Sequence, residues 1–197
     1  MTKNTDLTLK QASPTKLAHA VLRTKNHFDA MVAWYVDVLG ARIVHNTGTI
    51  AFMTYDDEHH RVAISEDTTL ADRVPRAVGV DHLAFTYASL GDLLATYSRL
   101  KSKGIMPFCC INHGPTHAIY YHDPDGNRLE LQVDNFETVA DSFAYMEGGF
   151  RDNPIGRGFD PDDYLRHLDA GRPERELLQP PRGGQVEPEV LAQLIAS

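Results

Sequence analysis

The chain contains one pattern twice, and this repeat constrains the fold more than any other feature. In each copy, a strand-like run with a histidine precedes a helical stretch that ends at glycine, and three short strand-like runs follow. His19 precedes Gly40 by 21 residues, and His82 precedes Gly104 by 22 residues. A unit of this size cannot bury its concave face alone, so we expect the two copies to pair.

The repeat predicts an α+β fold in which two tandem βαβββ modules form a cup-like mixed sheet, followed by a helical and irregular C-terminal tail. The first module is expected at about residues 16–66 and the second at about residues 80–133. Residues 1–133 would then form the paired domain, and residues 134–197 would form a C-terminal extension.

Local signals predict where the two long helices begin and end. Asn26 is placed to cap the first helix, and Ser89 with Asp92 resembles a capping box at the start of the second. Gly40 and Gly104 follow the last apolar positions of the helices, where glycine readily adopts the left-handed conformation. The helix limits therefore repeat along with the strands.

Composition excludes some classes of partner. The chain has 27 acidic and 19 basic side chains and a formal charge of -8, which argues against nucleic-acid binding. No apolar run reaches membrane-spanning length, and the polar N-terminus lacks the apolar core of a signal peptide, so we expect no membrane partner. Cys109 and Cys110 are adjacent and seldom suited to a structural disulfide, which predicts reduced thiols in a cytoplasmic protein.

The internal alignment brings out a candidate metal site. His19 and His82 occupy the same place in the first strand of each module, and aligning the last strands matches Ala63 with Glu130. The cup would then offer two imidazoles and one carboxylate, with the fourth place left empty. This donor set is the facial arrangement of non-haem Fe(II) oxygenases, whereas a structural metal site is closed by a fourth ligand. A metal-free cup with a polar lining is the alternative.

Four segments of the two modules resemble the vicinal oxygen chelate superfamily. Within it, they are similar to the type I extradiol catechol dioxygenases, in a short form with a single module pair. The resemblance covers residues 16–133, and its most specific pieces are AHAVL, FMTYDDEHHRVAI, VDHLAF and HGPTHAIYYHDPDGNRLEL.

The resemblance implies roles for individual residues. His19, His82 and Glu130 match the iron ligands of the family by position. His60, the second histidine of DEHH, matches the catalytic acid–base histidine, and Tyr120 matches a tyrosine that hydrogen-bonds the substrate oxygen.

Two further histidines compete for one role. His113 of HGPT resembles a histidine that faces the substrate or oxygen. The segment from His113 to Tyr120 is shorter than in the full-length enzymes of the family, so His117 is the alternative for substrate binding.

The resemblance also implies the activity. We expect an extradiol dioxygenase that inserts O₂ into a small aromatic diol at an Fe(II) site, with Mn(II) as the alternative metal. Apolar residues near the expected cup suggest a hydrophobic or substituted catechol, such as 2,3-dihydroxybiphenyl or a 3-alkylcatechol. An apolar helix in the tail would suit a homo-oligomer. The residues expected to line the cup are Phe52, Met53, Phe108, Ile119 and Phe143.

Two other functions stay open at this point. A glyoxalase-type isomerase or lyase would need a fourth protein ligand, which Ala63 cannot supply, although Glu66 or His60 could be recruited. A metal-free ligand-binding module of the same fold would have no need for the two histidines and the glutamate.

Overall fold

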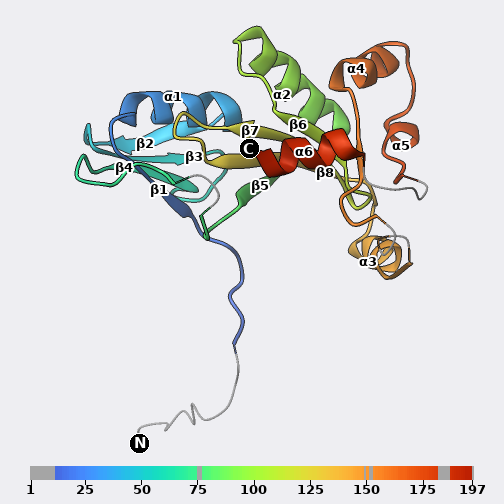
Figure 1. Ribbon diagram of the computed structural model, residues 1–197, viewed down its shortest axis with the longest axis horizontal. Helices are drawn as coiled ribbons and strands as arrows, with labels where there is room; N and C mark the ends of the chain where they lie inside the picture. The colour runs from blue at the N-terminus through green and yellow to red at the C-terminus, as the bar shows by residue number, and fades with distance from the viewer. Residues whose placement is uncertain (1–11, 75–76, 149, 151–152, 182–186, 197) are drawn as a thin grey trace, which may run out of the picture.

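The computed structural model in Figure 1 describes residues 12–74, 77–148, 150, 153–181 and 187–196. The two modules lie side by side, and each has one long helix on the same side of its strands (Figure 1). No helix within these ranges is long and apolar enough to cross a membrane.

The first module forms a four-stranded sheet in the order β1-β4-β3-β2. Strands β1 and β4 run parallel, and the other neighbours are antiparallel. Its elements are β1 (Ala20–Thr24), α1 (Phe28–Leu39), β2 (Arg42–Asn46), β3 (Ile50–Thr54) and β4 (Val62–Glu66).

The second module repeats this arrangement in the order β5-β8-β7-β6, and a short strand from the tail, β9, adds to the β6 edge. Strands β5 and β8 are again the parallel pair. Its elements are β5 (His82–Thr86), α2 (Leu90–Ser102), β6 (Cys109–Asn112), β7 (Thr116–His122) and β8 (Arg128–Asp134). The predicted α+β fold of two βαβββ modules is confirmed, with the described strands forming two open sheets.

The strand register agrees with the internal alignment of the sequence. Val21 pairs with Ala63 across β1 and β4, and Ala84 pairs with Glu130 across β5 and β8. Since Val21 and Ala84 are equivalent positions of the repeat, Ala63 and Glu130 are equivalent as well. The one acidic side chain of this pair therefore lies in the second module.

The helix ends follow the sequence signals with one exception. The side chain of Ser89 accepts a hydrogen bond from the Asp92 backbone N–H, as the capping box predicts. Gly40 has a φ of 60° and ends α1 in the left-handed conformation. The prediction that Asn26 caps α1 is wrong, because the helix begins one residue later, with His27 at the cap position and no side-chain cap bond.

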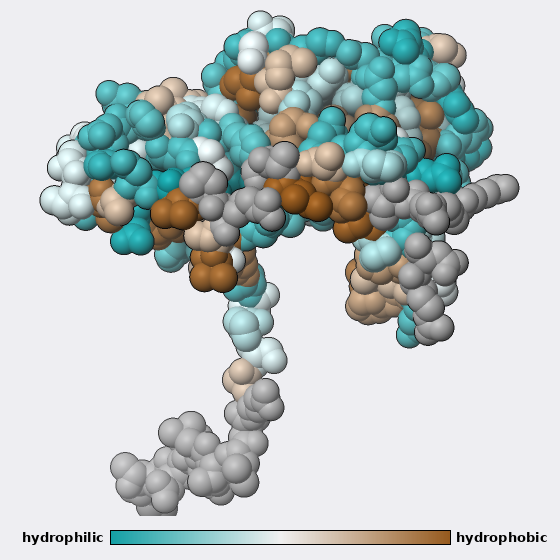
Figure 2. All heavy atoms as spheres, viewed as in Figure 1, coloured by the Kyte–Doolittle hydropathy of each residue, from teal (hydrophilic) through white to brown (hydrophobic). Residues whose placement is uncertain are grey.

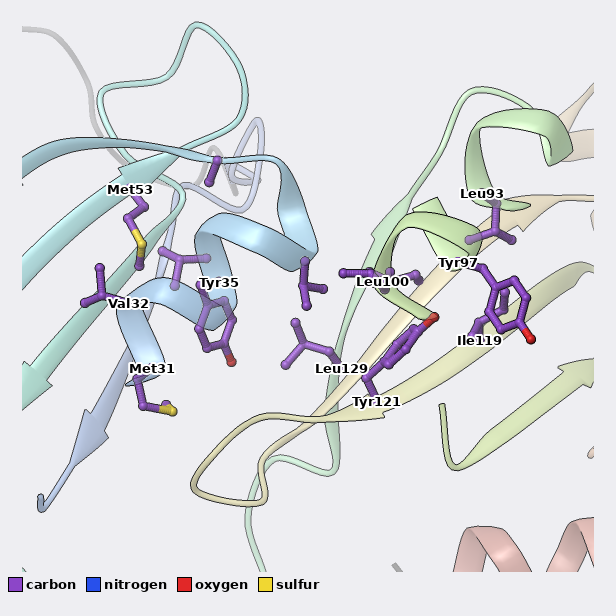
Figure 3. Packing of buried hydrophobic residues seen from close by; sticks show 14 of the residues in the cluster. Met31, Val32, Tyr35, Met53, Leu93, Tyr97, Leu100, Ile119, Tyr121 and Leu129 are labelled. Carbon is purple, nitrogen blue, oxygen red and sulfur yellow. The ribbon is translucent and has the colours of Figure 1, made fainter. Parts of the chain in front are cut away.

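The main core lies between the two helices and the sheets. Tyr35 of α1 and Leu100 of α2 are fully buried in it, and the facing sheet side chains include Tyr121 and Leu129 (Figure 3). Burial of such large apolar side chains is the main force that holds helix to sheet.

Several elements of the tail pack against the second module. Helix α4 packs beside α2, whereas α6 lies against β6. Glu174 at the start of α5 accepts hydrogen bonds from the backbone N–H groups of Leu90 (3.1 Å) and Gly91 (2.9 Å), which open α2. The tail elements are α3 (Val139–Gly148), β9 (Arg157–Gly158), α4 (Pro161–Asp169), α5 (Glu174–Leu177) and α6 (Pro188–Ala196).

Candidate active site

The polar candidates of the second module lie on the sheet face turned away from α2. Along β8, Leu129 and Leu131 enter the core beneath α2, so Glu130 between them faces the other way. Glu130 is paired with Ala84 of β5 on one side and with Tyr120 of β7 on the other. Paired residues of neighbouring strands face the same side, so this row lies on one face, here called the cup face.

His82 and Glu130 form the centre of the cup face. The Nε2 atom of His82 lies 2.9 Å from Oε2 of Glu130, whose side chain is only 7% exposed. Asp81 holds the other ring nitrogen of His82 at 2.8 Å. The hydrogen bond with Glu130, and next to it that with Asp81, outweighs burial and raises the pKa of His82 to about 9. A nitrogen atom and an oxygen atom that could both bind a metal therefore lie next to each other.

Tyr120 and His113 form a second pair on the same face. His113 Nε2 lies 2.8 Å from the Tyr120 hydroxyl, and its Nδ1 contacts the carbonyl oxygen of Ile155. Burial lowers the pKa of His113, so the ring is neutral near pH 7. Because a carbonyl only accepts, Nδ1 of His113 carries the proton and Nε2 accepts from the Tyr120 hydroxyl. Burial, followed by the charge of Glu130, raises the pKa of Tyr120.

The first module contributes a separate histidine pair. The ring centroids of His19 and His60 are 4.2 Å apart, and His60 also meets the ring of Phe52 at 5.1 Å. Burial, with the neighbouring histidines, lowers the pKa of His60. The His59 side chain is 67% exposed, and its Nδ1 lies 2.5 Å from Nδ1 of His60.

The two halves of the candidate site are neighbours, but the structure does not gather all three expected ligands. His19 lines a cavity of about 160 Å³ with Leu83, Ala84 and Phe85 of β5, the strand that begins with His82. Within the described residues, however, no three His, Cys, Asp or Glu side chains stand close enough together to hold a metal ion. His82 and Glu130 fit two ligands of a divalent metal in the chemistry of their donor atoms.

His117 lies on the opposite face of β7 from Tyr120. It is fully buried, with Nδ1 2.6 Å from Asn135 Oδ1 and Nε2 3.2 Å from the Tyr164 hydroxyl. The structure brings His113 and not His117 to Tyr120, because strand side chains alternate between faces. His117 is therefore left out of the site proposed below.

The expected apolar lining needs three corrections. Phe143 lies on α3 and is 61% exposed, so it does not form part of an enclosed lining. Met53 and Ile119 are fully buried in the main core beneath the helices, so their assignment to the lining is wrong. Phe108 does lie at the cup face, where its ring stacks on His122 at 4.2 Å. The sequence reasoning missed the contribution of α6 to this face, since no local pattern signals contacts between segments so far apart.

Comparisons with known proteins identify the family of the chain. Residues 16–131 match the family described as the Glyoxalase/Bleomycin resistance protein/Dioxygenase superfamily. The chain is 49% identical over 160 residues to biphenyl-2,3-diol 1,2-dioxygenase 2 of Rhodococcus globerulus, with 80% of this chain and 84% of that protein covered. It is 46% identical over 165 residues to biphenyl-2,3-diol 1,2-dioxygenase 3 of the same organism, with 82% and 86% covered.

A solved structure supports the fold. The glyoxylase/bleomycin resistance protein/dioxygenase domain from Frankia sp. EAN1pec superposes with a TM-score of 0.52. The superposition covers 62% of this chain and 99% of that domain, at 20% sequence identity. At this identity, the likeness concerns the fold alone.

Proposed function

The chain belongs to the Glyoxalase/Bleomycin resistance protein/Dioxygenase superfamily, and from this premise we propose that it cleaves the ring of a catechol with an apolar substituent. Because its relatives at 46% and 49% identity are biphenyl-2,3-diol 1,2-dioxygenases, the chain is an extradiol dioxygenase. These relatives do not favour a glyoxalase-type isomerase. Both relatives are named for biphenyl-2,3-diol, which supports 2,3-dihydroxybiphenyl or a 3-alkylcatechol as the substrate. The observation that carries the proposal is the His82–Glu130 pair with Tyr120 opposite Glu130 on one face.

The extradiol relatives imply a metal cofactor. We propose that His82 and Glu130 hold it together with His19, which lies just before β1, and that the metal is Fe(II), with Mn(II) as the alternative. When bound, such a metal lowers the pKa of a catechol hydroxyl and provides vacant coordination positions for the substrate and O₂. Ala63, equivalent to Glu130, cannot add a fourth ligand.

Tyr120 would orient the substrate. Because its hydroxyl donates to His113 Nε2, the lone pairs of the Tyr120 oxygen stay available to accept a hydrogen bond from a substrate hydroxyl. The carbonyl of Ile155 holds the His113 ring in the tautomer that this arrangement needs. The pair is thus positioned before the substrate arrives.

His60 would move a proton during the reaction. Its ring lies 4.2 Å from that of His19, one of the proposed ligands, and its Nδ1 lies 2.5 Å from Nδ1 of His59. An imidazole at such a position can take a proton from the substrate and return it to the developing product. We therefore propose His60 as the acid–base residue.

Metal content and activity, measured together, test this function. Protein loaded anaerobically with Fe(II) is expected to turn 2,3-dihydroxybiphenyl yellow on exposure to air. Glu130→Ala is expected to lose the metal. His60→Ala should keep it and lose activity by about 100-fold, within the range that general acid–base catalysis supplies. His167→Ala, on α4 and outside the proposed site, is the control and should behave like the parent.

Two results would overturn the proposal. One is a loaded protein that is inactive on 3-methylcatechol and 2,3-dihydroxybiphenyl but converts the methylglyoxal–glutathione adduct. The other is a Glu130→Ala variant that binds as much metal as the parent.

We also propose a cytoplasmic homo-oligomer. Cys109 and Cys110 are both free thiols, which suits a reducing compartment. Helix α3 exposes Val139, Phe143 and Met146 at helical spacing, which would suit a contact between subunits. Size-exclusion chromatography with light scattering would test the oligomeric state. The formal charge of -8 supports the prediction that nucleic acid is not a partner.

A further inference from the structure

Helix α6 lies beside β6 (Figure 1) and packs on the cup face in one cluster with Tyr120. Val190 is only 6% exposed and belongs to one cluster with Cys109, Ile111, Ala118 and Tyr120. Cys109 and Tyr120 are direct partners across β6 and β7, and Tyr120 is in turn the partner of Glu130. The helix therefore meets the sheet roughly 10 Å, or two strand spacings, from Glu130.

Polar contacts fasten both ends of α6 to the module. The guanidinium of Arg128 donates to the main-chain carbonyl of Leu194 at 2.7 Å, near the end of the helix. At the other end, Glu187 accepts a 3.1 Å hydrogen bond from the backbone N–H of Gly158. Such contacts satisfy carbonyl and N–H groups that would otherwise lack partners. The helix is thus a fixed part of this face.

Leu194 connects the cluster around Tyr120 with a large cavity that is lined by Asp81, the residue before His82. It packs against the cluster, and it also lines a cavity of about 940 Å³ together with Val80, Asp81 and Arg128. Asp81 is the residue that holds His82. This volume is at the upper end of the range for small-molecule sites. The lining is mixed, with Val80, Leu194 and Ile195 beside the charged side chains of Arg23, Arg73 and Arg128.

We propose that α6 is the wall of the substrate pocket that selects the ring substituent, with Leu194 in contact with that substituent. The inference rests on the proposed function, since it assumes a catechol at His82 and Glu130. A phenyl or alkyl group that extends from such a ring toward the cavity would meet Leu194 and Val80. Unsubstituted catechol would not reach them.

The outer side of α6 provides a matched control. Figure 2 shows apolar surface gathered along α6, where Leu191 is exposed. Leu191 is 39% exposed, and it is the same residue type on the same helix as Leu194. A change at Leu191 alters the apolar area of α6 to a similar degree without altering the proposed wall.

The test compares two substrates in three proteins. For Leu194→Ala, we expect kcat/KM for 2,3-dihydroxybiphenyl to fall about tenfold, mainly through KM, while kcat/KM for catechol changes less than twofold. The main-chain carbonyl that binds Arg128 remains in this variant. Leu191→Ala is expected to match the parent with both substrates. The anaerobic dissociation constant of 2,3-dihydroxybiphenyl should rise in parallel for Leu194→Ala alone.

A second variant makes the proposed wall bulkier instead of smaller. Ile195→Trp adds volume to a residue of the cavity lining without changing the cluster around Tyr120. It should slow the conversion of 2,3-dihydroxybiphenyl relative to catechol. Equal losses on both substrates in Leu194→Ala, or an unchanged ratio in both variants, would overturn the inference. A parent protein without activity on any catechol would instead overturn the proposed function.

Discussion

The hydroxyl of Tyr35 on α1 donates a 3.0 Å hydrogen bond to the carboxylate of Asp123, in the turn between β7 and β8. Both side chains are buried, so the bond joins the first module to the second within the core. Asp123 also accepts from Asn127, and this arrangement shapes the turn that leads into β8 and Glu130. The bond thus ties the turn before β8, the strand that carries Glu130, to the first module.

The first prediction concerns this bond. Tyr35→Phe removes the hydroxyl and leaves a buried carboxylate with one donor fewer, so the free energy of unfolding should fall by about 1–3 kcal/mol. Urea unfolding followed by circular dichroism measures the change. Tyr121→Phe is the control, because the Tyr121 hydroxyl is buried without a hydrogen-bond partner among the described residues. That variant should be as stable as the parent or more stable. Equal effects of the two substitutions would contradict the role given to the Tyr35–Asp123 bond.

The second prediction concerns the loss of folding stability at acid pH that His117 causes. Burial lowers the pKa of His117 to about 4, so the folded protein keeps this ring neutral where the unfolded chain already binds a proton. The contribution is fully present above pH ~6.5 and is lost as the pH falls toward 4. Between pH 7 and 5 it amounts to about 2 kcal/mol.

Urea unfolding at pH 7 and at pH 5 checks this prediction. The parent should lose more stability between the two values than His117→Gln, which has no ring to protonate. An identical loss in the two proteins would show that His117 does not titrate differently on folding.

The third prediction concerns the loop that holds His113. Gly156 has a φ of 102°, and a Cβ at this position would lie 2.1 Å from the Asn112 carbonyl oxygen and 2.7 Å from the His113 Cα. Gly156→Ala should therefore move the loop, displace the Ile155 carbonyl from His113, and reduce both melting temperature and catechol turnover. Gly171→Ala, at a φ of 81° but with open space around it, is the control for conformational strain alone. It should cost about 1 kcal/mol and leave turnover unchanged. A Gly156→Ala variant with normal turnover would show that this loop does not contribute to the site.

The fourth prediction concerns the Tyr120 hydroxyl. Tyr120→Phe keeps the packing against Cys109 but cannot accept a hydrogen bond from the substrate or donate one to His113. We expect kcat for 2,3-dihydroxybiphenyl to fall about 10- to 100-fold, with the bound metal unchanged. Tyr121→Phe, on the opposite face of the same strand, should retain full activity. A Tyr120→Phe variant as active as the parent would refute the orienting role.

The sequence by itself determined the elements and the faces of the strands. The repeat placed the two modules, and the alternation along β8 separated Glu130 from Leu129 and Leu131. These features depend on the local backbone period and on pairing between equivalent strands, which a sequence records directly. One local signal failed, because Asn26 is followed by a helix that starts one residue later than expected.

Only the tertiary structure decided which distant segments meet at the cup face. It brought His113 rather than His117 to Tyr120, buried Met53 and Ile119 in the core, and returned α6 to lie beside the proposed catalytic residues. It also showed the His19 ring next to that of His60 in the first module, where His19 shares a small cavity with β5 but lies outside the His82–Glu130 pair. Such contacts arise from burial of apolar surface between segments far apart in the chain, and no periodicity within a segment specifies its partner.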